Sequence, residues 1–463
     1  HKPLFRVTTR LGRRVDTTAT HPFLTLDGWQ PLSELAVGEP IAVPRRLPVF
    51  GERPLRDCEV AILGYLLGDG CLTGRTPKLV NQNPAIQTDF IEAATVFGGV
   101  RALLKSWPQR TAEVCVVADR ALTKNNRRVF ARRLLAALDQ IGCTQRALAA
   151  ATGASPASVC NWTQGRSMPG PAMFDAIAAF FAEAQVDWSP QRRESGTKNG
   201  PNALTRWLIE LDLWGRDAHR KMVPAPIFQL PKAQLGLFLN RLFATDGWAT
   251  VLATGQCQIG YGSVSERLAR QVQHLLLRFG VVAKLRRRTI RHEPLHSVAW
   301  QLDITDARSI RLFATEIGIF SKETAIARVL ETLDHKRLQT NTDLIPPAVW
   351  ERLRAAKGDT SWAGLARRAG LPDANNLHVG KRALSRQRLA QLADALQDDA
   401  LKDLASSDLY WDPIVSIEPL GSHQVYDLTV PETHNFVAND LCVHNTSFAM
   451  NLAENAAIKT GKG

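Results

Sequence analysis

Alternation between apolar and polar residues marks both ends of the chain. Residues 4–9 (Leu-Phe-Arg-Val-Thr-Thr) and 15–18 alternate in this way and are rich in β-forming residues, with a possible turn at 11–14 between them. The same pattern returns at residues 414–419, after residues 399–413, which we predict to be a polar connection. We therefore predict a β-hairpin at the start, strands of the same character near the end, and one β domain that contains both, with other structure inserted into it.

The middle of the chain changes to apolar helices that carry small residues. Residues 59–70 and 234–247 each form such a stretch, and each is followed by a β-like segment. Both end in an Asp-Gly pair, at 69–70 and 246–247, and we expect the glycine to stop the helix with a positive φ. One such helix would be an ordinary core helix, whereas two copies of the same layout predict an internal repeat.

Composition adds a basic charge to this picture. Lys and Arg number 57 against 44 Asp and Glu, for a formal charge of +13, which favours a polyanionic partner such as nucleic acid or, alternatively, indicates only a basic soluble enzyme. The 7 cysteines form no Cys-x-x-Cys pair, so neither a zinc ribbon nor a disulfide framework is supported. No run of about 18 apolar residues is present, and we expect a cytoplasmic protein without membrane contact.

The most specific chemistry lies near the end, in Val443-His444-Asn445-Thr446. An asparagine side-chain amide can attack its own carbonyl carbon, which closes a succinimide ring and breaks the peptide bond to the next residue. The histidine before Asn445 can move protons during that step. This segment therefore predicts self-catalysed release of whatever follows Asn445.

Four motifs together resemble an intein, a self-splicing protein. These are the Thr-x-x-His block at 18–21, the continuation at 32–44, the segment 426–430, and the closing run from 434 to 445. The resemblance implies an all-β Hint splicing domain, built from both chain ends, that needs no cofactor. It also implies roles for individual residues. Thr18 and His21 would polarise the N-terminal junction, and Asp427 would tune the central steps. His434 and His444 would activate the C-terminal junction, where Asn445 cyclises, and Thr446 would be the attacking alcohol in transesterification.

The first splicing nucleophile is missing from this sequence. Inteins begin with Cys or Ser some tens of residues before the Thr-x-x-His block, but His1 stands only 20 positions before His21. We therefore expect a fragment that lacks the N-terminal junction, able to cleave at Asn445 but unable to splice unless the missing piece is supplied in trans. Its partners in splicing are the flanking host segments, the exteins.

The repeated helices resemble the two LAGLIDADG motifs of homing endonucleases. That resemblance implies an α+β, monomeric, pseudo-twofold nuclease in which Asp69 and Asp246 hold Mg²⁺ and cleave double-stranded DNA, the intein-free host gene. Lys221 resembles the family's basic block before the second helix, and Lys284 is its counterpart in the second repeat. Basic strand residues that would contact the DNA are Arg286, Arg287 and Arg288.

The spacing between the two acids predicts a further insertion. They lie 177 positions apart (246 minus 69), which is long for one repeat. Residues 144–155, followed by 156–169, resemble a phage-repressor helix-turn-helix, and a poorer copy stands at 360–371. The residues predicted to face DNA are Ser155, Ser158, Asn161 and Gln164 in the first copy and Lys381 and Arg382 in the second.

After Asn445, residues 446–457 read as a helix and resemble the helix after the phosphate-binding loop of DnaB-type replicative helicases. The resemblance implies a homo-oligomeric host ATPase in which the hydroxyl of Thr446 binds Mg²⁺ beside ATP once splicing has restored Gly-Lys-Thr.

The predicted organisation is multidomain, with seven segments. They are the truncated first part of the Hint domain at 1–55, nuclease repeat 1 at 56–126, a helix-turn-helix-like insertion at 127–190, the end of repeat 1 with repeat 2 at 191–335, the second helix-turn-helix-like segment at 340–410, the closing part of the Hint domain at 411–445 and the start of the C-extein at 446–463. Two alternatives stay open: an intein whose nuclease binds DNA without cutting it, and a helix-turn-helix regulator without chemistry.

Overall fold

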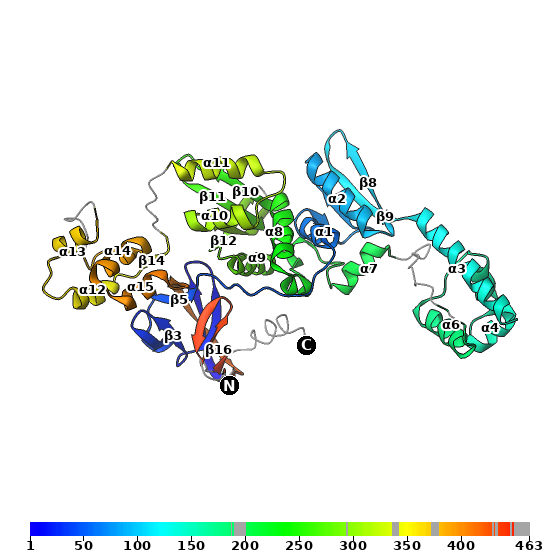
Figure 1. The fold of residues 1–463 in the computed structure, drawn as a ribbon, viewed down its shortest axis with the longest axis horizontal. Coiled ribbons are helices and arrows are strands. Elements are labelled where there is room, and N and C mark those ends of the chain that lie inside the picture. The colour runs from blue at the N-terminus through cyan, green and yellow to red at the C-terminus, as the bar shows by residue number, and fades with distance from the viewer. Residues whose placement is uncertain are drawn as a thin grey trace. The chain divides into compact units, whose positions relative to one another are not determined.

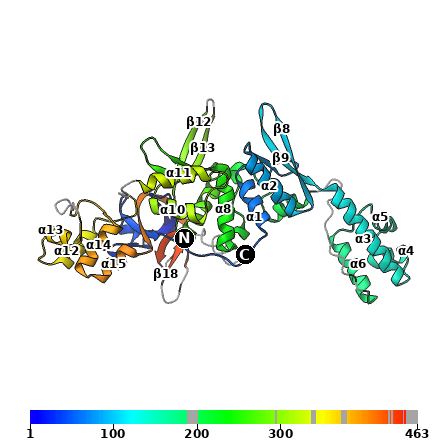
Figure 2. The same cartoon turned by 45° about the horizontal axis from the view of Figure 1, so that its top comes forward.

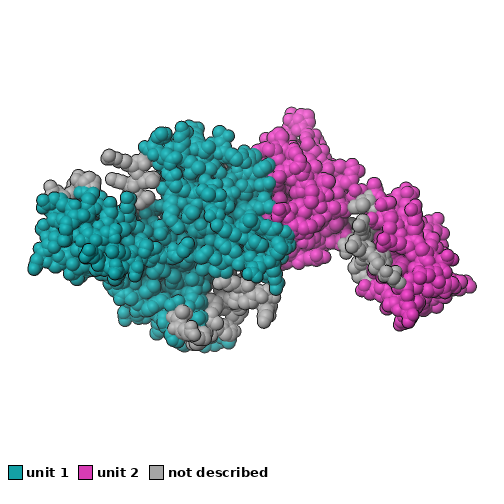
Figure 3. Space-filling model, viewed as in Figure 1, with its two compact units in different colours: residues 1–55, 218–463 teal, residues 56–217 magenta. Residues whose placement is uncertain are grey.

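The computed structural model describes residues 1–186, 188, 201–292, 295–335, 342–371, 379–427, 430, 434–444 and 447–448. Two compact units are present. Residues 1–55 and 218–463 form the first, and residues 56–217 form the second (Figure 3). Within the described residues, no helix combines the length and the apolar character that crossing a bilayer would need.

Both ends of the chain meet in one β-sheet of the first unit. β1 pairs along its length with β16, Val7 opposite Ile417, and with β2, Val7 opposite Val15 (Figure 1). This confirms the prediction that the start and the end of the chain share a domain. The sheet order is β17-β20-β2-β1-β16-β5, and the strands span Tyr426–Asp427, Ser447–Phe448, Arg14–Thr18, Lys2–Thr9, Leu409–His423 and Pro40–Pro44.

A second sheet completes the β domain. Its order is β18-β19-β3-β4, with bounds Asn435–Ala438, Leu441–His444, Pro22–Thr25 and Gly28–Pro31, and the short 3-10 helix η1 (Leu32–Glu34) follows it. Alternate residues of β3 and β19 are buried, and together with residues of the first sheet they form one apolar core. Its members include Val7, Phe23, Ile41, Ile414 and Val443. The core therefore fixes the strand that ends at His444 against the strand that begins just after His21.

The rest of the first unit contains a four-stranded sheet covered by helices. The strand order is β10-β11-β13-β12, with bounds Gly247–Val251, Cys257–Ser263, Leu295–Ile304 and Lys284–His292. In Figure 2, β12 and β13 run side by side as a long hairpin. The helices are α8 (Lys232–Asp246), α9 (Glu266–Arg278), α10 (Ala307–Glu316) and α11 (Glu323–Asp334), preceded by η2 (Ala218–Arg220) and η3 (Ala225–Gln229).

The second unit contains a sheet of the same design. Its order is β6-β7-β9-β8, with bounds Gly70–Cys71, Lys78–Val80, Arg110–Ala118 and Val100–Trp107, and its helices are α1 (Asp57–Leu67), α2 (Pro84–Phe97) and α7 (Ala203–Glu210). In each of these two segments a helix is followed by two strands, a second helix and two more strands. The last strand of each segment, β13 or β9, lies between two other strands of its sheet. The two segments are therefore topological repeats, as the duplicated sequence pattern predicts.

The second unit also carries a cluster of helices, α3 (Arg120–Gln140), α4 (Gln145–Thr152), α5 (Pro156–Thr163) and α6 (Pro171–Glu183). Their apolar faces form a separate core around Leu134, Leu148, Val159, Ile177 and Phe181. The side chain of Thr144 caps α4, that of Ser155 caps α5, and Gly153 takes a left-handed conformation between them. Two short helices joined through a glycine turn are the arrangement predicted for this segment.

A further group of helices in the first unit is built directly onto the β domain. It comprises α12 (Val349–Lys357), α13 (Trp362–Arg368), α14 (Arg386–Leu396) and α15 (Asp399–Ser406), with the strand pair β14 (Leu344–Ile345) and β15 (Leu384–Ser385). Trp350 is at the centre of a core that includes Leu26, Ala42 and Trp411 of the β domain. The prediction of a polar connection at 399–413 is wrong, because Leu401 and Ala405 bury one face of α15 and β16 begins at Leu409.

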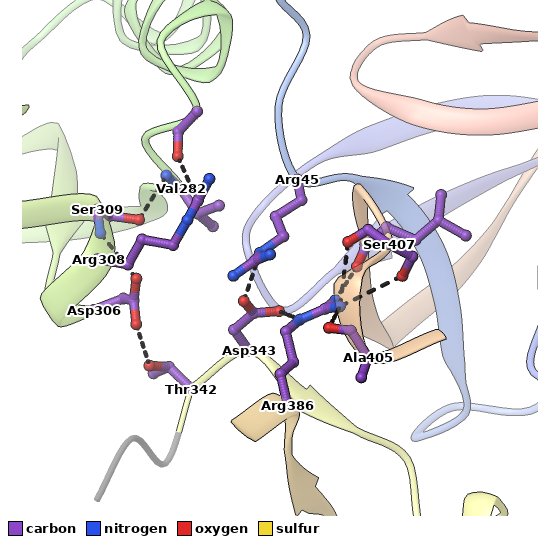
Figure 4. Close-up of polar contacts among 12 residues, drawn as sticks. Arg45, Val282, Asp306, Arg308, Ser309, Thr342, Asp343, Arg386, Ala405 and Ser407 are labelled. Atoms are coloured by element: carbon purple, nitrogen blue, oxygen red, sulfur yellow. Dashed lines mark hydrogen bonds and ion pairs between the residues drawn. The ribbon is translucent and has the colours of Figure 1, made fainter. Parts of the chain in front are cut away.

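One carboxylate ties this helical group to the β domain. Asp343 Oδ2 forms an ion pair with Arg45 Nε at 2.6 Å, and Asp343 Oδ1 accepts a hydrogen bond from Arg386 Nε at 2.8 Å (Figure 4). The Arg386 guanidinium also donates to the carbonyls of Ala405 at 3.1 Å and Ser407 at 3.2 Å. All three charged side chains are largely buried, so the pairing is fixed by several hydrogen bonds and is more than a surface contact.

Candidate functional site

Two histidines of the closing hairpin lie together. His434 precedes β18 and His444 ends β19, and Asn435 pairs with His444 across the hairpin. The two imidazole rings stack with centroids 6.3 Å apart. Trp29 of β4 meets His444 edge-on at 5.1 Å, because β4 and β19 both flank β3. Trp29 was not among the predicted site residues, although its place in the turn after the Thr-x-x-His block was a usable signal.

His21 stands on the neighbouring strand connection and is fully buried. Its backbone N–H donates to the carbonyl of Thr18 at 3.1 Å, and its carbonyl accepts from Leu32 at 2.9 Å, so both flanks of the residue are fixed. The ring packs edge-on against Phe23 at 5.3 Å. Burial, with a smaller contribution from nearby His444, lowers the pKa of His21 to about 4, so the imidazole is neutral at physiological pH.

Thr18 ends β2 and is almost completely buried, with its hydroxyl 3.3 Å from that of Thr20. The structure therefore brings four predicted residues, Thr18, His21, His434 and His444, into the region where β2, β3, β18 and β19 meet.

The junction itself, Asn445 and Thr446, lies outside the described residues. The backbone on either side is described: β19 ends at His444, and β20 begins at Ser447. In β20, Phe448 pairs with both Tyr426 and Thr17, and Ser447 pairs with Asp427. The predicted helix is therefore wrong at residues 447–448, because pairing with two neighbouring strands overrides local helix preference. The remainder of residues 446–457 lies outside the described part.

The two repeat acids occupy matching places. Asp246 is the last residue of α8, and Asp69 comes two residues after α1. Both are half-buried, and Asp69 Oδ2 accepts from Asn81 Nδ2 at 2.6 Å. Carboxylate oxygens are the ligands that Mg²⁺ prefers, so the chemistry of these side chains fits that ion. Among the described residues, no cluster of three or more His, Cys, Asp and Glu side chains forms an alternative metal site.

The glycines after these acids act differently from the prediction. Gly247 has φ −96°, and neither Gly70 nor Gly247 has a positive φ. A Cβ atom at Gly70 would lie 2.3 Å from the carbonyl oxygen of Leu66, and one at Gly247 would lie 2.6 Å from Phe243 Cδ1. Both glycines are therefore required by close approach to the residue one helical turn earlier. The expectation of positive φ at these positions is wrong.

Three lysines in or near the second repeat are candidate basic groups beside its aspartate. Lys221 is buried, and its carbonyl accepts from Ser265 Oγ at 2.7 Å. Lys284 opens β12 opposite Asp303. Lys322 was not predicted, yet its Nζ donates to the carbonyl of Gly247 at 2.6 Å, next to Asp246. The sequence around Lys322 carries no recognisable pattern, so only the fold brings this ammonium group to the tip of α8.

A polar network orders the basic strand. Asp303, almost fully buried on β13, accepts from Gln301 at 2.5 Å and from Arg286 Nε at 2.5 Å. Arg288 in turn donates to Gln301 at 2.5 Å. Arg286 and Arg288 thus share one face of β12, whereas Arg287 projects from the other and is exposed.

The predicted reading face of the first helix-turn-helix lies along α5. The hydroxyls of Ser155 and Ser158 are 2.9 Å apart, and the backbone N–H of Ser158 donates to Ser155 Oγ at 3.1 Å. Asn161 is half-buried on α5, and Gln164 is exposed at its end. In the second segment Lys381 and Arg382 are both exposed just before α14, and residues 372–378 between α13 and this pair lie outside the described part.

Comparison with known proteins gives the family. A family model described as an intein splicing domain matches residues 1–445. Relatives include the replicative DNA helicase DnaB of Rhodothermus marinus, 31% identical over 96% of this chain and 40% of the relative, and that of Synechocystis sp., 29% identical over 96% and 43%. Protein RecA of Mycobacterium tuberculosis is 27% identical over 98% and 50%. The chain thus spans less than half the length of the two helicases.

Proposed function

The chain belongs to the intein splicing domain family, and on that premise we propose that Asn445 releases the polypeptide after it by cyclisation. The side-chain nitrogen forms a bond to the carbonyl carbon of the same residue, and the peptide bond to Thr446 breaks. The attacking nitrogen gives up a proton and the departing amine takes one. Groups that move protons must therefore stand beside this bond.

The observation that carries this proposal is the stacking of His434 on His444, the residue directly before Asn445. Their centroid separation of 6.3 Å places two imidazoles at one end of the hairpin, so that one can polarise the carbonyl while the other protonates the leaving amine. Trp29 covers one edge of His444 and restricts its rotation.

His21 and Thr18 serve the other junction in this proposal. With a pKa of about 4, His21 is neutral above mildly acidic pH and can exchange a proton with the N-terminal scissile peptide without first losing a charge. The Thr18 hydroxyl lies 3.3 Å from that of Thr20, the residue before His21, and Asp427 lies in β17, opposite Ser447. The attacking groups of that half-reaction would be a Cys or Ser at the N-terminal junction and then Thr446.

Asn445→Ala tests the cyclisation. We expect the wild-type chain to release the peptide that begins at Thr446, and the variant to release none, by mass spectrometry of the intact protein. Asn451→Ala, a change of the same kind within the released segment, is the matched control and should leave the rate unchanged. Equal release from Asn445→Ala and the wild type would refute the assigned role.

We further propose that the two repeats form a homing endonuclease of the LAGLIDADG type. Two observations support it: the repeats share one topology, and in both an aspartate stands at or just after the end of the leading helix. Asp69 and Asp246 would hold Mg²⁺, which supplies charge stabilisation and an activated water in phosphodiester cleavage. Lys221, Lys284 and Lys322 are the candidate basic groups, and the Nζ contact with Gly247 favours Lys322 as the one beside Asp246.

Double-stranded DNA carrying the intein-free host gene is the proposed substrate. The exposed guanidinium groups of Arg286 and Arg288, which Asp303 and Gln301 order, can contact phosphates and guanine edges, and exposed Arg287 can do so from the other face of β12. Residues along α5 and the pair Lys381 and Arg382 would extend the contact, and the formal charge of +13 supports a polyanion partner.

Cutting and binding assays separate the alternatives. We expect the wild type to cut a linear DNA carrying the uninterrupted host gene in Mg²⁺, and Asp69→Asn or Asp246→Asn to bind that DNA in a gel-shift assay without cutting it. Binding without cutting by the wild type would instead indicate a nuclease that has lost activity. Cutting by Asp69→Asn at the wild-type rate would remove the nuclease proposal.

The host is proposed to be a replicative helicase, since two relatives carry that name. Splicing would then place Thr446 after Gly-Lys in a phosphate-binding loop, where its hydroxyl would bind Mg²⁺ beside ATP. The sequence of the codons before His1 tests this. We expect a Cys or Ser at the first position of the intein with Gly-Lys directly before it, and any other residue pair there would contradict the assignment.

A further inference from the structure

The turn that joins β18 to β19 has an unusual residue. Asn439 and Asp440 form the turn, with φ of 48° and 62°. Two-residue hairpin turns of this kind favour Asn followed by Gly, because the second position strains any side chain. Asp440 nevertheless occupies it and is nearly fully buried. A residue that the turn disfavours, buried with its charge, indicates that the carboxylate has a partner.

That partner is His274 of α9, in the nuclease repeat. His274 Nδ1 lies 2.7 Å from Asp440 Oδ1, and His274 Nε2 accepts from Arg278 Nε at 3.2 Å. A guanidinium only donates, so Nε2 carries no proton and Nδ1 donates to the carboxylate. Arg278 also donates to the carbonyl of Phe228 at 2.7 Å. A continuous chain of hydrogen bonds thus runs from the nuclease repeat to the splicing hairpin.

The same helix holds the first hairpin of the β domain. Gln273 Nε2 donates to the carbonyl of Leu11 at 2.8 Å, and Arg270 donates to that of Gly12 at 2.7 Å. A Cβ atom at Gly12, whose φ is +83°, would lie 2.6 Å from the carbonyl oxygen of Leu285, so the turn sits directly on β12. Buried Arg13 links the two turns by donating to the carbonyl of Asp440 at 3.0 Å.

We propose that α9 positions the splice junction. The contact of His274 with Asp440, here named the α9 clamp, fixes the turn of the β18–β19 hairpin. The other end of this hairpin carries His434 and His444. The proposal rests on cyclisation of Asn445 as the releasing step. Asp440 directly precedes the four-residue strand β19 and His444 ends it, so tilting the turn displaces the imidazole. His274 is a positioning residue that acts through Asp440, and the repeat that carries α9 thereby sets the rate of cleavage at the junction.

Two substitutions of His274 provide the test, with release of the peptide after Asn445 as the readout. Asn places its amide nitrogen near the position of Nδ1 and can donate to Asp440, whereas Gln reaches the position of Nε2 and cannot. We expect His274→Gln to slow release roughly ten- to hundredfold, the range that a misplaced catalytic group produces. His274→Asn should restore most of the rate, at an unfolding temperature equal to that of the Gln variant.

Asp440→Gly gives the second arm, because glycine relieves the strain of the turn while removing the carboxylate. We expect it to slow release as much as His274→Gln, and the double variant to be no slower than either, since both remove one contact. His219→Gln, an exposed histidine of the same unit, is the control and should keep the wild-type rate. Equal release by the wild type, His274→Gln and Asp440→Gly overturns the α9 clamp alone, and a wild type that releases nothing overturns the cyclisation as well.

Discussion

Asp412 gives the prediction with the clearest magnitude. This residue of β16 is completely buried, and its carboxylate oxygens accept from the backbone N–H of Leu11 at 3.1 and 3.3 Å. Burial raises its pKa from 3.8 to about 6, although Arg13 and the hydrogen bonds act in the opposite direction. A shift of roughly 2 units corresponds to a cost of about 3 kcal/mol for holding the ionised form in the fold.

The sign of the pH effect follows from proton binding. Between pH 4 and 6 the native state retains the Asp412 proton, whereas the unfolded chain has released it. The native state therefore binds more protons in this window, and stability falls as pH rises through it, then stays constant above about pH 6. Asp412→Asn keeps an acceptor for Leu11 and carries no charge, so we expect about 1–3 kcal/mol of stabilisation at pH 7.5 and almost none at pH 4.

Amide exchange in β1 and β16 measures this directly. The opening free energy of this sheet sets the exchange rate, so the variant should exchange about 10- to 100-fold more slowly than the wild type at pH 7.5. Comparison at one pH cancels the intrinsic rates. Asp408→Asn, an exposed carboxylate paired with Arg46, should change exchange little. Faster exchange in Asp412→Asn, or an equal effect at pH 4 and 7.5, would contradict a cost of ionising buried Asp412.

Three other predictions concern single residues. His21 should titrate near pH 4 by NMR and destabilise the fold as pH falls from 6.5 towards 4, because the unfolded chain then binds the proton more readily, and a measured pKa of 6.5 would contradict its burial. Asp343→Asn should lower the free energy of unfolding by roughly 3–5 kcal/mol, since two largely buried guanidinium groups lose their counter-charge, and a calorimetric change as small as that of Asp408→Asn would contradict this. Gly247→Ala should cost about 1–3 kcal/mol in thermal unfolding through its contact with Phe243, whereas Gly170→Ala, with open space around it, should cost little, and equal effects would exclude the steric explanation.

The strands at the two chain ends were predictable because period-2 alternation reports local burial directly. Residues 4–9 and 15–18 form β1 and β2 almost as expected, and the repeat of small-residue helices corresponds to a repeated topology. These features depend on patterns within about fifteen residues, the window over which helix and strand periodicity can be read.

Features that depend on distant partners were not predictable. The role of Gly247 depends on approach to Phe243 and not on φ, α15 replaces an expected polar connection, and β20 forms only because β2 and β17 offer free edges. Lys322 and Asp440 gain their partners, Gly247 and His274, across 75 and 166 positions. No local pattern encodes such contacts, because the residues involved are ordinary in their own segments.

Release at Asn445 depends on closure of its side-chain amide onto its own carbonyl carbon. High-resolution mass spectrometry of the fragment that ends at Asn445, collected soon after release and kept at mildly acidic pH, measures the chemistry of its new terminus. Cyclisation should give a fragment one water lighter than the hydrolytic product, which is the mass of a terminal succinimide. A fragment that carries a free carboxylate from the first time point, with no lighter species before it, would contradict cyclisation.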